Sequence, residues 1–369
     1  MSHWSHHNPV RVHAGPGVLR QLPQWVSPGR WLLVTTPGFT RRGLTDHVRG
    51  LLPSVQFLVH DAVSPNPELE DLDQSTGRFR QEALTGVLAV GGGSVLDAAK
   101  VLAVTLPSGL RDPLDQVLRQ GRRHEWEKKL PLVAIPTTSG TGAEVTPFAT
   151  VWGRSERKKY SVAGDRLFPD VAVLDPELTL SLPGKETLYP GLDAVSHALE
   201  SLWNINRTPI SSAFAIQALQ LAVEALPGVL SDPAALGARS DMQSASLLAG
   251  LAISQTRTAL AHSISYPLTS HYGVPHGLAC SFTLPRLIGH YLAEFPHCPE
   301  KGLLLRVESM LRKLDLDAHL GAYASRKEID AVKGEMYTPD RAGNFVARVA
   351  DDTLEKVIFP DASTPPRKH

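Results

Sequence analysis

The chain has 369 residues, enough for two domains with full hydrophobic cores. Its 37 basic and 37 acidic residues balance, so charge gives no argument for a nucleic-acid or membrane-surface partner. Only two cysteines occur, no apolar run reaches the ~20 residues that span a bilayer, and the N-terminal residues lack the apolar core of a signal peptide. We therefore expect a cytoplasmic protein without a disulfide framework and without a nucleic-acid or membrane partner.

Short apolar runs alternate with helical-looking segments between about residue 10 and residue 180. Five runs rich in valine, leucine and isoleucine are predicted as strands, at 31–35, 55–59, 86–90, 132–135 and 171–174. Their continuous apolar character is typical of strands that are buried on both faces. Because strands that alternate with helices form βαβ units, we predict a largely parallel sheet in an α/β domain.

A glycine-rich loop, Gly91-Gly-Gly-Ser-Val-Leu-Asp-Ala-Ala-Lys100, follows the third of these strands. Its glycines let a phosphate approach the chain closely, and a helix that begins there directs free N–H groups at a pyrophosphate. Ser94 and Asp97 also have the spacing of a capping box with Ser94 as N-cap, a role that is compatible with phosphate binding. The loop differs from the Gly-x-Gly-x-x-Gly fingerprint, so it does not identify the ligand by itself.

A second polar loop, Pro136-Thr-Thr-Ser-Gly-Thr-Gly-Ala-Glu-Val-Thr146, follows the next strand. Two such loops at the carboxyl ends of parallel strands form the crevice in which α/β sheets bind nucleotides. Either loop alone is also compatible with a plain turn. Together they favour an extended, phosphate-bearing ligand.

Four side chains in the second half form a candidate metal site. Asp193 and His197 are four residues apart in an apolar run, so both side chains leave one face of a helix. Taken alone, the pair would be read first as a helix-stabilising contact. His262 and His276 add two nitrogen donors, and one oxygen with three nitrogens suits Fe(II) or Zn(II) with a coordination position left open.

The stretch Ser181–Lys185 is the expected boundary between a first domain, residues 1–182, and a second domain, residues 183–369. Apolar residues beyond it recur at helical spacing over 213–226, 242–253, 260–268 and 278–292, which predicts an all-α helical domain. Shorter helices are expected at 300–314, 326–332 and 351–357, with a frayed tail at 361–369. The turn-rich loop 336–344 contains Arg341, a residue suited to an anionic substrate or simply to the surface.

These motifs together resemble the iron-containing (group III) alcohol dehydrogenase family, which is related to glycerol dehydrogenases and dehydroquinate synthases. The resemblance rests on the two loops, on Asp193-x-x-x-His197, on His262 and on Pro275-His-Gly277, with weaker matches at 65–67 and 175–178. It follows the family's order as far as about residue 290. It implies a Rossmann-like nucleotide domain, an all-α domain, a metal and substrate cleft between them, and a homodimer or larger homo-oligomer.

The resemblance also assigns residues. It implies that Asp193, His197, His262 and His276 bind the metal, with Fe(II) expected first and Zn(II) or Mn(II) compatible. The cofactor, NADPH or NADH, is expected to contact Asn66, Gly92, Gly93, Ser94, Asp97, Thr137, Thr138, Thr141 and, near a ribose, Lys159. In this family the metal acts as a Lewis acid on the substrate oxygen, and the nicotinamide exchanges the hydride.

Two positions depart from the family pattern. Many members have a proton-relaying histidine four residues after the third ligand, and this chain has Tyr266 there. Tyrosine titrates near ~10, so His271 is a second relay candidate, although a plain surface histidine fits as well. NAD-preferring members often read Val-Thr-Asp after the first long strand, where this chain reads Val-Thr-Thr and then offers Arg41 and Arg42. We hypothesise that either arginine pairs with a 2′-phosphate, so that NADPH is tolerated or preferred; two solvated arginines are the alternative.

The stretch from His262 to His271 resembles family members associated with phosphonate metabolism. The leading hypothesis is therefore reduction of phosphonoacetaldehyde to 2-hydroxyethylphosphonate. A general primary-alcohol or diol dehydrogenase is the alternative within the family. A dehydroquinate-synthase-like lyase is more remote, because its additional lysines and arginines are not found around the metal motifs. A non-catalytic assembly protein would be expected to have damaged metal ligands, and the four ligands are intact.

Overall fold

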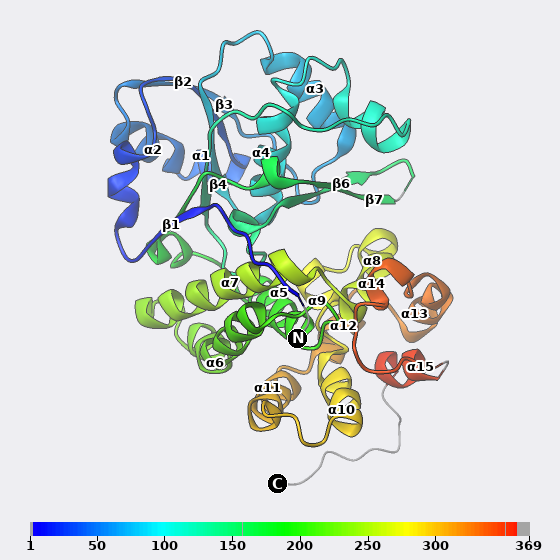
Figure 1. Ribbon diagram of the computed structural model, residues 1–369. Helices are drawn as coiled ribbons and strands as arrows, with labels where there is room; N and C mark the ends of the chain where they lie inside the picture. Colours follow the sequence, from blue (N-terminus) through cyan, green and yellow to red (C-terminus); the bar gives the residue numbers. More distant parts are fainter. Residues whose placement is uncertain (1–2, 157, 351, 360–369) are drawn as a thin grey trace.

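The computed structural model describes residues 3–156, 158–350 and 352–359. Six strands form one parallel sheet with the order β1-β8-β5-β4-β2-β3 (Figure 1). Their bounds are β1 Arg11–Ala14, β2 Gly29–Val34, β3 Val55–His60, β4 Gly86–Gly91, β5 Leu132–Pro136 and β8 Val171–Leu174. An antiparallel hairpin, β6 Phe148–Gly153 and β7 Lys158–Ala163, lies beside this sheet.

Both faces of the sheet are buried, as the apolar runs predict. Alternate residues of β2 and β4 point into two separate cores, with Leu32 and Val87 on one side and Leu33 and Leu88 on the other. The first core is completed by α3 (Leu69–Phe79) and α4 (Gly93–Thr105), and the second by α1 (Pro37–Arg41) and α2 (Leu44–Leu51). The predicted Rossmann-like parallel sheet is thereby confirmed.

The five predicted strands are all present, but three further strands were missed. β1 is an exposed edge strand of four residues that pairs with β8, far away along the chain. The hairpin strands β6 and β7 are as long as β2 but only partly buried, and buried and exposed positions are mixed along them. Strands outside the doubly covered core lack the continuous apolar run that identifies a buried strand.

The second half is helical, which confirms the predicted all-α part. The long helices are α5 Gly184–Leu202, α6 Pro209–Ser231, α7 Leu236–Thr256, α8 Leu260–Tyr272, α10 Leu284–Glu294 and α11 Lys301–Lys313. The short ones are α9 His276–Ala279, α12 Leu316–Gly321, α13 Arg326–Ala331, α14 Pro339–Ala342 and α15 Thr353–Ile358. The predicted tail at 361–369 and residue 351 lie outside the described residues.

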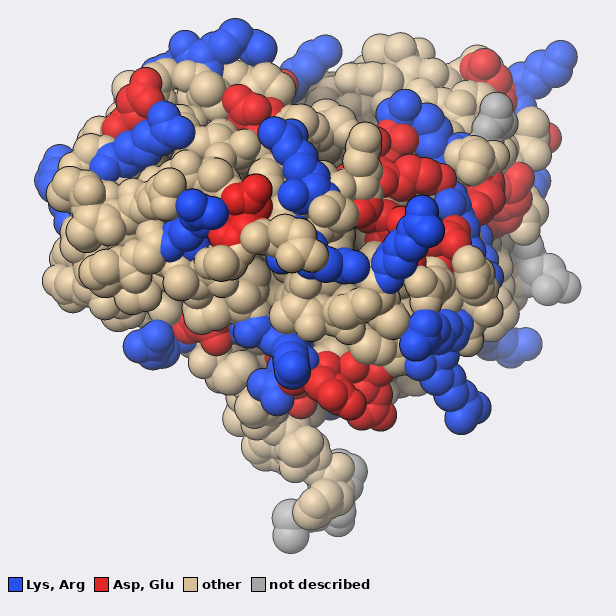
Figure 2. Space-filling model, turned by 90° about the horizontal axis from the view of Figure 1, so that it is seen from above, with Lys and Arg blue, Asp and Glu red and all other residues tan. Residues whose placement is uncertain are grey.

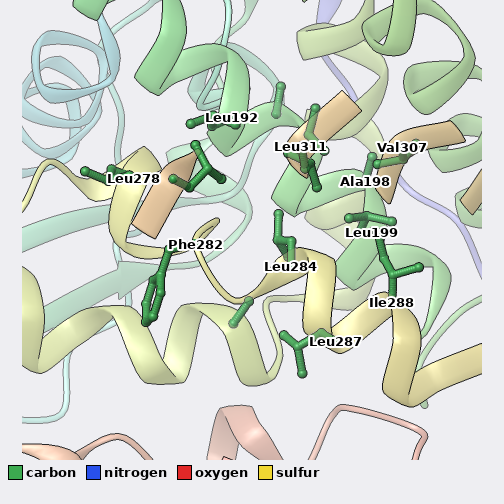
Figure 3. Close-up of a cluster of buried hydrophobic side chains, with 14 of the residues drawn as sticks. Leu192, Ala198, Leu199, Leu278, Phe282, Leu284, Leu287, Ile288, Val307 and Leu311 are labelled. Atoms are coloured by element: carbon green, nitrogen blue, oxygen red, sulfur yellow. The ribbon is translucent and has the colours of Figure 1, made fainter. Parts of the chain in front are cut away.

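The core of the helical part surrounds α5. Leu192 and Leu199 of α5 converge with Leu287 and Ile288 of α10 and with Leu311 of α11 (Figure 3). Each of these side chains is fully buried. Since burying a leucine or isoleucine stabilises a fold by about 1.5–3 kcal/mol, this cluster fixes the position of α5 and of the polar side chains it carries.

The helix predicted over 278–292 is wrong as a single element. α9 ends at Ala279 and α10 begins at Leu284, with a turn between them. Pro285 lies in the first turn of α10, where its missing N–H costs nothing, but it would break a helix that continued from α9. The turn is also held by the Ser281 hydroxyl, which donates to the Leu192 carbonyl at 3.0 Å.

The expectation that no apolar run is long enough to span a membrane is wrong for α6. By length and composition alone α6 could cross a bilayer, although 44% of its most apolar stretch is buried inside the protein. It packs against α5 and α7 and contributes Leu219 and Leu226 to the helical core. Its apolar character is therefore also that of a core helix.

The surface seen from above carries both signs of charge. Lysine and arginine side chains are interspersed with aspartate and glutamate side chains on that face (Figure 2). This mixture agrees with the balanced charge of the whole sequence.

Candidate metal and cofactor site

Helix α5 places Asp193 and His197 on one face, as their spacing predicts. The His197 Nε2 atom lies 3.7 Å from the Asp193 Oδ1 atom, and both side chains are buried. His262 of α8 and His276 at the start of α9 approach the same oxygen, with Nε2–Oδ1 distances of 3.4 Å and 3.7 Å. Three imidazoles from three helices thus converge on one carboxylate oxygen.

These separations fit a bound metal ion. Ligand atoms about 2.1 Å from one tetrahedral ion lie about 3.4 Å from each other, close to the three distances observed. The Nε2 atom of His262 and the Nδ1 atom of His197 are buried and have no hydrogen-bond partner among the described residues. Because buried polar atoms are normally satisfied, an unpartnered His262 Nε2 facing a carboxylate is the arrangement expected of a metal ligand.

A close approach of α9 to α5 brings His276 into this cluster. A Cβ atom at Gly277 would lie only 1.8 Å from the carbonyl oxygen of Tyr189, so no residue other than glycine fits there without a shift of the backbone. Pro275 is the N-cap of α9 and leaves His276 as its first residue. In the Pro-His-Gly tripeptide, the glycine therefore allows α9 to pack closely on α5, and the histidine supplies a nitrogen donor to the cluster.

Glu200 is a site residue that the sequence reasoning missed. Its buried carboxylate lies 2.7 Å from the Nδ1 atom of His262 and accepts the backbone N–H groups of Ala259 and His262 at 2.8 Å and 3.1 Å. This contact holds the His262 ring so that its Nε2 atom faces Asp193. The available signal was an acidic residue three positions after His197 and seven after Asp193, on the same face of the predicted helix.

The electrostatics of the cluster match the needs of a cation. Burial alone would raise the pKa of Asp193, but the surrounding imidazoles hold that pKa well below its usual range. Burial lowers the pKa of His276 to about 3 and also lowers the pKa of His197, with Asp193 opposing both shifts. Burial also disfavours the charged form of His262, but the carboxylates of Glu200 and Asp193 outweigh burial and raise the pKa of His262, so a metal ion would displace a proton from this ring when it binds.

Cys280 is the second residue that was missed. Its Sγ atom lies 3.4 Å from Asp193 Oδ1, and the ligand atoms of Asp193, His262, His276 and Cys280 are all within 4.8 Å of one another. The structure therefore offers a donor set with Cys280 in place of His197. Burial raises the pKa of the Cys280 thiol well above its usual value, so the thiol is protonated as long as no metal ion is bound.

Access to the cluster differs between its members. The His276 side chain is 31% exposed, whereas the side chains of Asp193, His197 and His262 are 3%, 9% and 2% exposed. The cluster is therefore closed around α5 and α8 and open on the side of His276. A site of this kind leaves room for a substrate at the metal.

The glycine loop forms the start of α4. Gly92 is its N-cap and makes no side-chain cap, so the first N–H groups of this 13-residue helix remain available to an anion. The predicted capping box is wrong, because the helix begins at Gly93, ahead of Ser94. Instead, the Ser94 hydroxyl accepts the Asn66 backbone N–H at 3.2 Å, and Asp97 accepts the Thr150 N–H at 2.8 Å.

The second loop lies directly against the first. The Thr137 N–H donates to the Gly91 carbonyl at 3.0 Å, and a Cβ atom at Gly93 would lie 2.5 Å from the Thr141 methyl group. Thr138 approaches the Cβ position of Gly92 to 3.3 Å. The structure thus brings together the predicted cofactor residues Asn66, Gly92, Gly93, Ser94, Thr137, Thr138 and Thr141, at the carboxyl ends of β4 and β5.

The second loop also touches two helices of the helical part, α5 and α7. A Cβ atom at Gly140 would lie 2.5 Å from Pro190 of α5, three residues before Asp193. Gly142, with φ +61°, packs on Gly250 of α7, where a Cβ atom would approach the Gly250 Cα to 2.4 Å. The first contact joins the predicted cofactor loop to the predicted metal helix α5, and the second joins it to α7, which packs on α5.

Lys159 and Tyr266 lie together near the metal cluster. The Lys159 Nζ atom is 4.3 Å from the centre of the Tyr266 ring, and burial followed by the charge of Arg341 lowers the pKa of Lys159 to about 8. Burial raises the pKa of Tyr266 to about 12. Tyr266 therefore remains protonated at neutral pH, and its ring is a contact surface for cations.

Three predicted residues are not brought into the cluster. His271 pairs with Glu335, with 2.9 Å between Nε2 and Oε2, at a partly exposed position. Arg41 and Arg42 are exposed at the end of α1. Thr36, at the position where NAD-preferring relatives have aspartate, caps α1 by accepting the Phe39 N–H.

Family models match most of the chain. Residues 9–176 match the model described as iron-containing alcohol dehydrogenase, and residues 187–332 match the C-terminal model of the Fe-containing alcohol dehydrogenase family. Both the predicted cofactor loops and all four predicted metal ligands lie inside these ranges.

Individual relatives agree with the family models. The chain is 39% identical over 280 residues, 74% of its length and 68% of the relative's, to a phosphonoacetaldehyde reductase of Streptomyces viridochromogenes. It is 36% identical over 287 residues, 76% of its length and 72% of the relative's, to long-chain-alcohol dehydrogenase 1 of Geobacillus thermodenitrificans. The crystal structure of a sulfoacetaldehyde reductase from Bifidobacterium kashiwanohense in complex with NAD+ matches with a TM-score of 0.84 at 28% identity, covering 96% of this chain and 98% of the other.

Proposed function

We propose that this chain, which belongs to the iron-containing alcohol dehydrogenase family, is an NAD(P)H-linked aldehyde reductase whose metal is held by Asp193, His197, His262 and His276. The observation that carries the metal assignment is the convergence of three Nε2 atoms on the Asp193 Oδ1 atom within 3.4–3.7 Å. When bound, the divalent ion supplies Lewis acidity at the substrate carbonyl and the nicotinamide supplies the hydride.

The residues of this chain have distinct tasks in that reaction. Asp193 brings the negative charge, and Glu200 fixes the tautomer of His262. Gly92 and Gly93 open α4 toward the pyrophosphate, and the threonines of the second loop line the dinucleotide. The packing of Gly140 on Pro190 sets the distance between the cofactor loops and the metal helix. We place the division between the sheet domain and the helical domain at residues 182 and 183.

The substrate that we propose is phosphonoacetaldehyde, reduced to 2-hydroxyethylphosphonate. It is supported by the stretch from His262 to His271 and by the relative that is 39% identical. A general primary-alcohol or diol dehydrogenase is the second candidate, because a long-chain-alcohol dehydrogenase is 36% identical to the chain. A homodimer or larger homo-oligomer in the cytoplasm completes the proposal.

The test follows NADPH and NADH oxidation with phosphonoacetaldehyde and with propionaldehyde. The enzyme is stripped of metal and then resupplied with Fe(II) or Zn(II), and bound metal is measured by mass spectrometry. We expect metal-dependent turnover that strongly favours phosphonoacetaldehyde. Equal or faster turnover of propionaldehyde would assign the protein to the general alcohol dehydrogenases, and metal-loaded enzyme inactive on both aldehydes would contradict the reductase proposal.

Cofactor choice is a separate part of the proposal. Thr36 replaces the carboxylate that repels a 2′-phosphate, and the exposed Arg41 and Arg42 follow in the same segment. We therefore propose that NADPH is tolerated or preferred. A kcat/KM with NADH that greatly exceeds the value with NADPH would refute this, and a fall in the NADPH value alone on Arg41→Gln plus Arg42→Gln would support it.

A further inference from the structure

Two positively charged side chains meet on the ring of Tyr266 beside the metal cluster. The Lys159 Nζ atom lies 4.3 Å from the ring centre, and the Arg341 guanidinium carbon lies 5.3 Å from it. Both side chains are half-buried, and neither forms an ion pair within the part of the chain that the structure describes. Because placing unpaired cations out of water is costly, such a pair is typical of an anion-binding site.

Arg341 is attached to the same framework that orients the metal ligands. Its Nη1 atom donates to the Thr258 hydroxyl at 2.9 Å. The next residue, Ala259, donates its N–H to Glu200, which also holds His262. Arg341 is therefore fixed relative to His262 through one loop and one carboxylate.

The helix that carries Arg341, α14, is held on α8. The Ser263 hydroxyl donates to the Met336 carbonyl at 2.7 Å and accepts the Thr338 N–H at 2.8 Å. On the other side of Arg341, the Asn344 amide donates to the Thr258 carbonyl at 2.8 Å. Because hydrogen bonds hold the chain on both sides of Arg341, its guanidinium group is preorganised, and little conformational entropy is lost when an anion binds.

Lys159 reaches the same place from the sheet side of the molecule. It lies on β7, where its Nζ atom is also 5.8 Å from the ring of Trp152. Burial first and then the charge of Arg341 lower the pKa of Lys159, and Asp193 acts in the opposite direction, so the ammonium group is within electrostatic reach of both side chains. An uncharged aliphatic substrate would leave this pair of cations without a counter-charge.

We propose that Lys159, in place of the ribose contact that the family resemblance implies, and Arg341 bind the anionic headgroup of the substrate, a tetrahedral oxyanion such as a phosphonate or a sulfonate, while its aldehyde group reaches the Asp193 cluster. Tyr266 positions the two cations through its ring and takes no part in proton transfer. This inference rests on the proposed reductase function and assigns the residues that select the substrate of that site.

The experiment compares wild type with Arg341→Gln and Lys159→Gln in the metal-loaded enzyme. The quantity measured is the ratio of kcat/KM for phosphonoacetaldehyde to kcat/KM for propionaldehyde. A charge-assisted contact that is lost should lower this ratio by about 30-fold in either variant, chiefly through KM. Arg341→Lys should restore part of it, and Arg348→Gln, at an exposed arginine on the same segment, is the matched control.

A binding measurement separates this inference from the proposed function. Calorimetry with methylphosphonate and with methanesulfonate needs no turnover, and we expect wild type to bind the phosphonate more tightly because two cations face a dianion. Arg341→Gln should weaken that binding by at least about tenfold. The inference would be overturned if the kcat/KM ratio and methylphosphonate binding were both unchanged in the two variants. It would also be overturned if kcat/KM fell equally for both aldehydes. Either result would count against it even if the wild type reduces phosphonoacetaldehyde.

Discussion

The metal cluster and the cofactor loops are built on opposite principles. The cluster uses side chains that lie up to 83 positions apart in the sequence and that are held by three helices. The loops offer mainly backbone N–H groups and hydroxyls, and their glycines leave space where a side chain would clash. They lie within two short stretches that follow neighbouring strands. We therefore expect metal binding to need every donor of the cluster. We expect cofactor binding to need the space that the loop glycines leave and to tolerate the loss of a single hydroxyl.

The largest effect is expected for Asp193→Ala. The change removes the only carboxylate of the proposed ligand set and leaves three imidazoles without their shared anion. Since the metal contributes several kcal/mol to the chemical step, kcat/KM should fall by about a thousandfold or more, with bound metal lost. Metal content and turnover are measured together, with Asp241→Ala at an exposed position of α7 as control. Full metal content in Asp193→Ala would contradict the assignment.

The next effect tests the carboxylate behind the cluster. Glu200→Gln keeps the shape of the side chain but weakens the contact with the Nδ1 atom of His262. Metal affinity, measured by competition with a chelator, should fall about 10–100-fold, the usual loss for a residue that orients a ligand. Glu186→Gln changes an exposed glutamate of the same helix and should leave affinity unchanged. Equal affinities in the two variants would show that Glu200 has no orienting role.

Gly93→Ala tests the claim that the loops depend on space. The added Cβ atom meets the Thr141 methyl group at 2.5 Å, so the loops must move apart. We expect the KM for the nicotinamide cofactor to rise about tenfold, which corresponds to a loss of about 1.4 kcal/mol of binding free energy. Metal content should remain unchanged. Thr141→Ser removes that methyl group and should restore part of the loss. Gly77→Ala, where a Cβ atom meets nothing, should instead stabilise α3 by up to about 1 kcal/mol.

The smallest effect is expected for Ser94→Ala. The variant loses one acceptor, for the Asn66 N–H, at an exposed contact of 3.2 Å. The cofactor dissociation constant, measured by nicotinamide fluorescence, should rise only about 2–10-fold, the value of one ordinary hydrogen bond. A loss comparable to that of Asp193→Ala would mean that hydroxyls, and not backbone, hold the cofactor, and would break the contrast between the two regions.

The sequence predicted the parts of the molecule whose signal is local. The five buried strands follow from their continuous apolar composition. The four-residue spacing of Asp193 and His197 places both side chains on one face of α5. The capping box failed because α4 begins at Gly93, and a shift of one residue changes the role of Ser94. The hairpin β6–β7 was missed because its strands are only partly buried and therefore lack a continuous apolar run.

Site residues whose role depends on contacts between distant parts of the chain could not be predicted from the sequence. Glu200 and Cys280 become part of the site only because α8 and the turn after α9 pack on α5. The assembly of Lys159 and Arg341 on Tyr266 likewise depends on the placement of β7 and α14. In each case the sequence supplied the residue type, and the tertiary packing decided the neighbour.

The most direct test of the account is X-ray absorption at the iron edge of the Fe(II)-loaded enzyme, because it distinguishes the two donor sets around Asp193. We predict only nitrogen and oxygen neighbours at about 2.0–2.2 Å, with the multiple-scattering signature of three imidazoles that His197, His262 and His276 would give. A sulfur neighbour at about 2.3 Å would place Cys280 on the metal and contradict the ligand set proposed here.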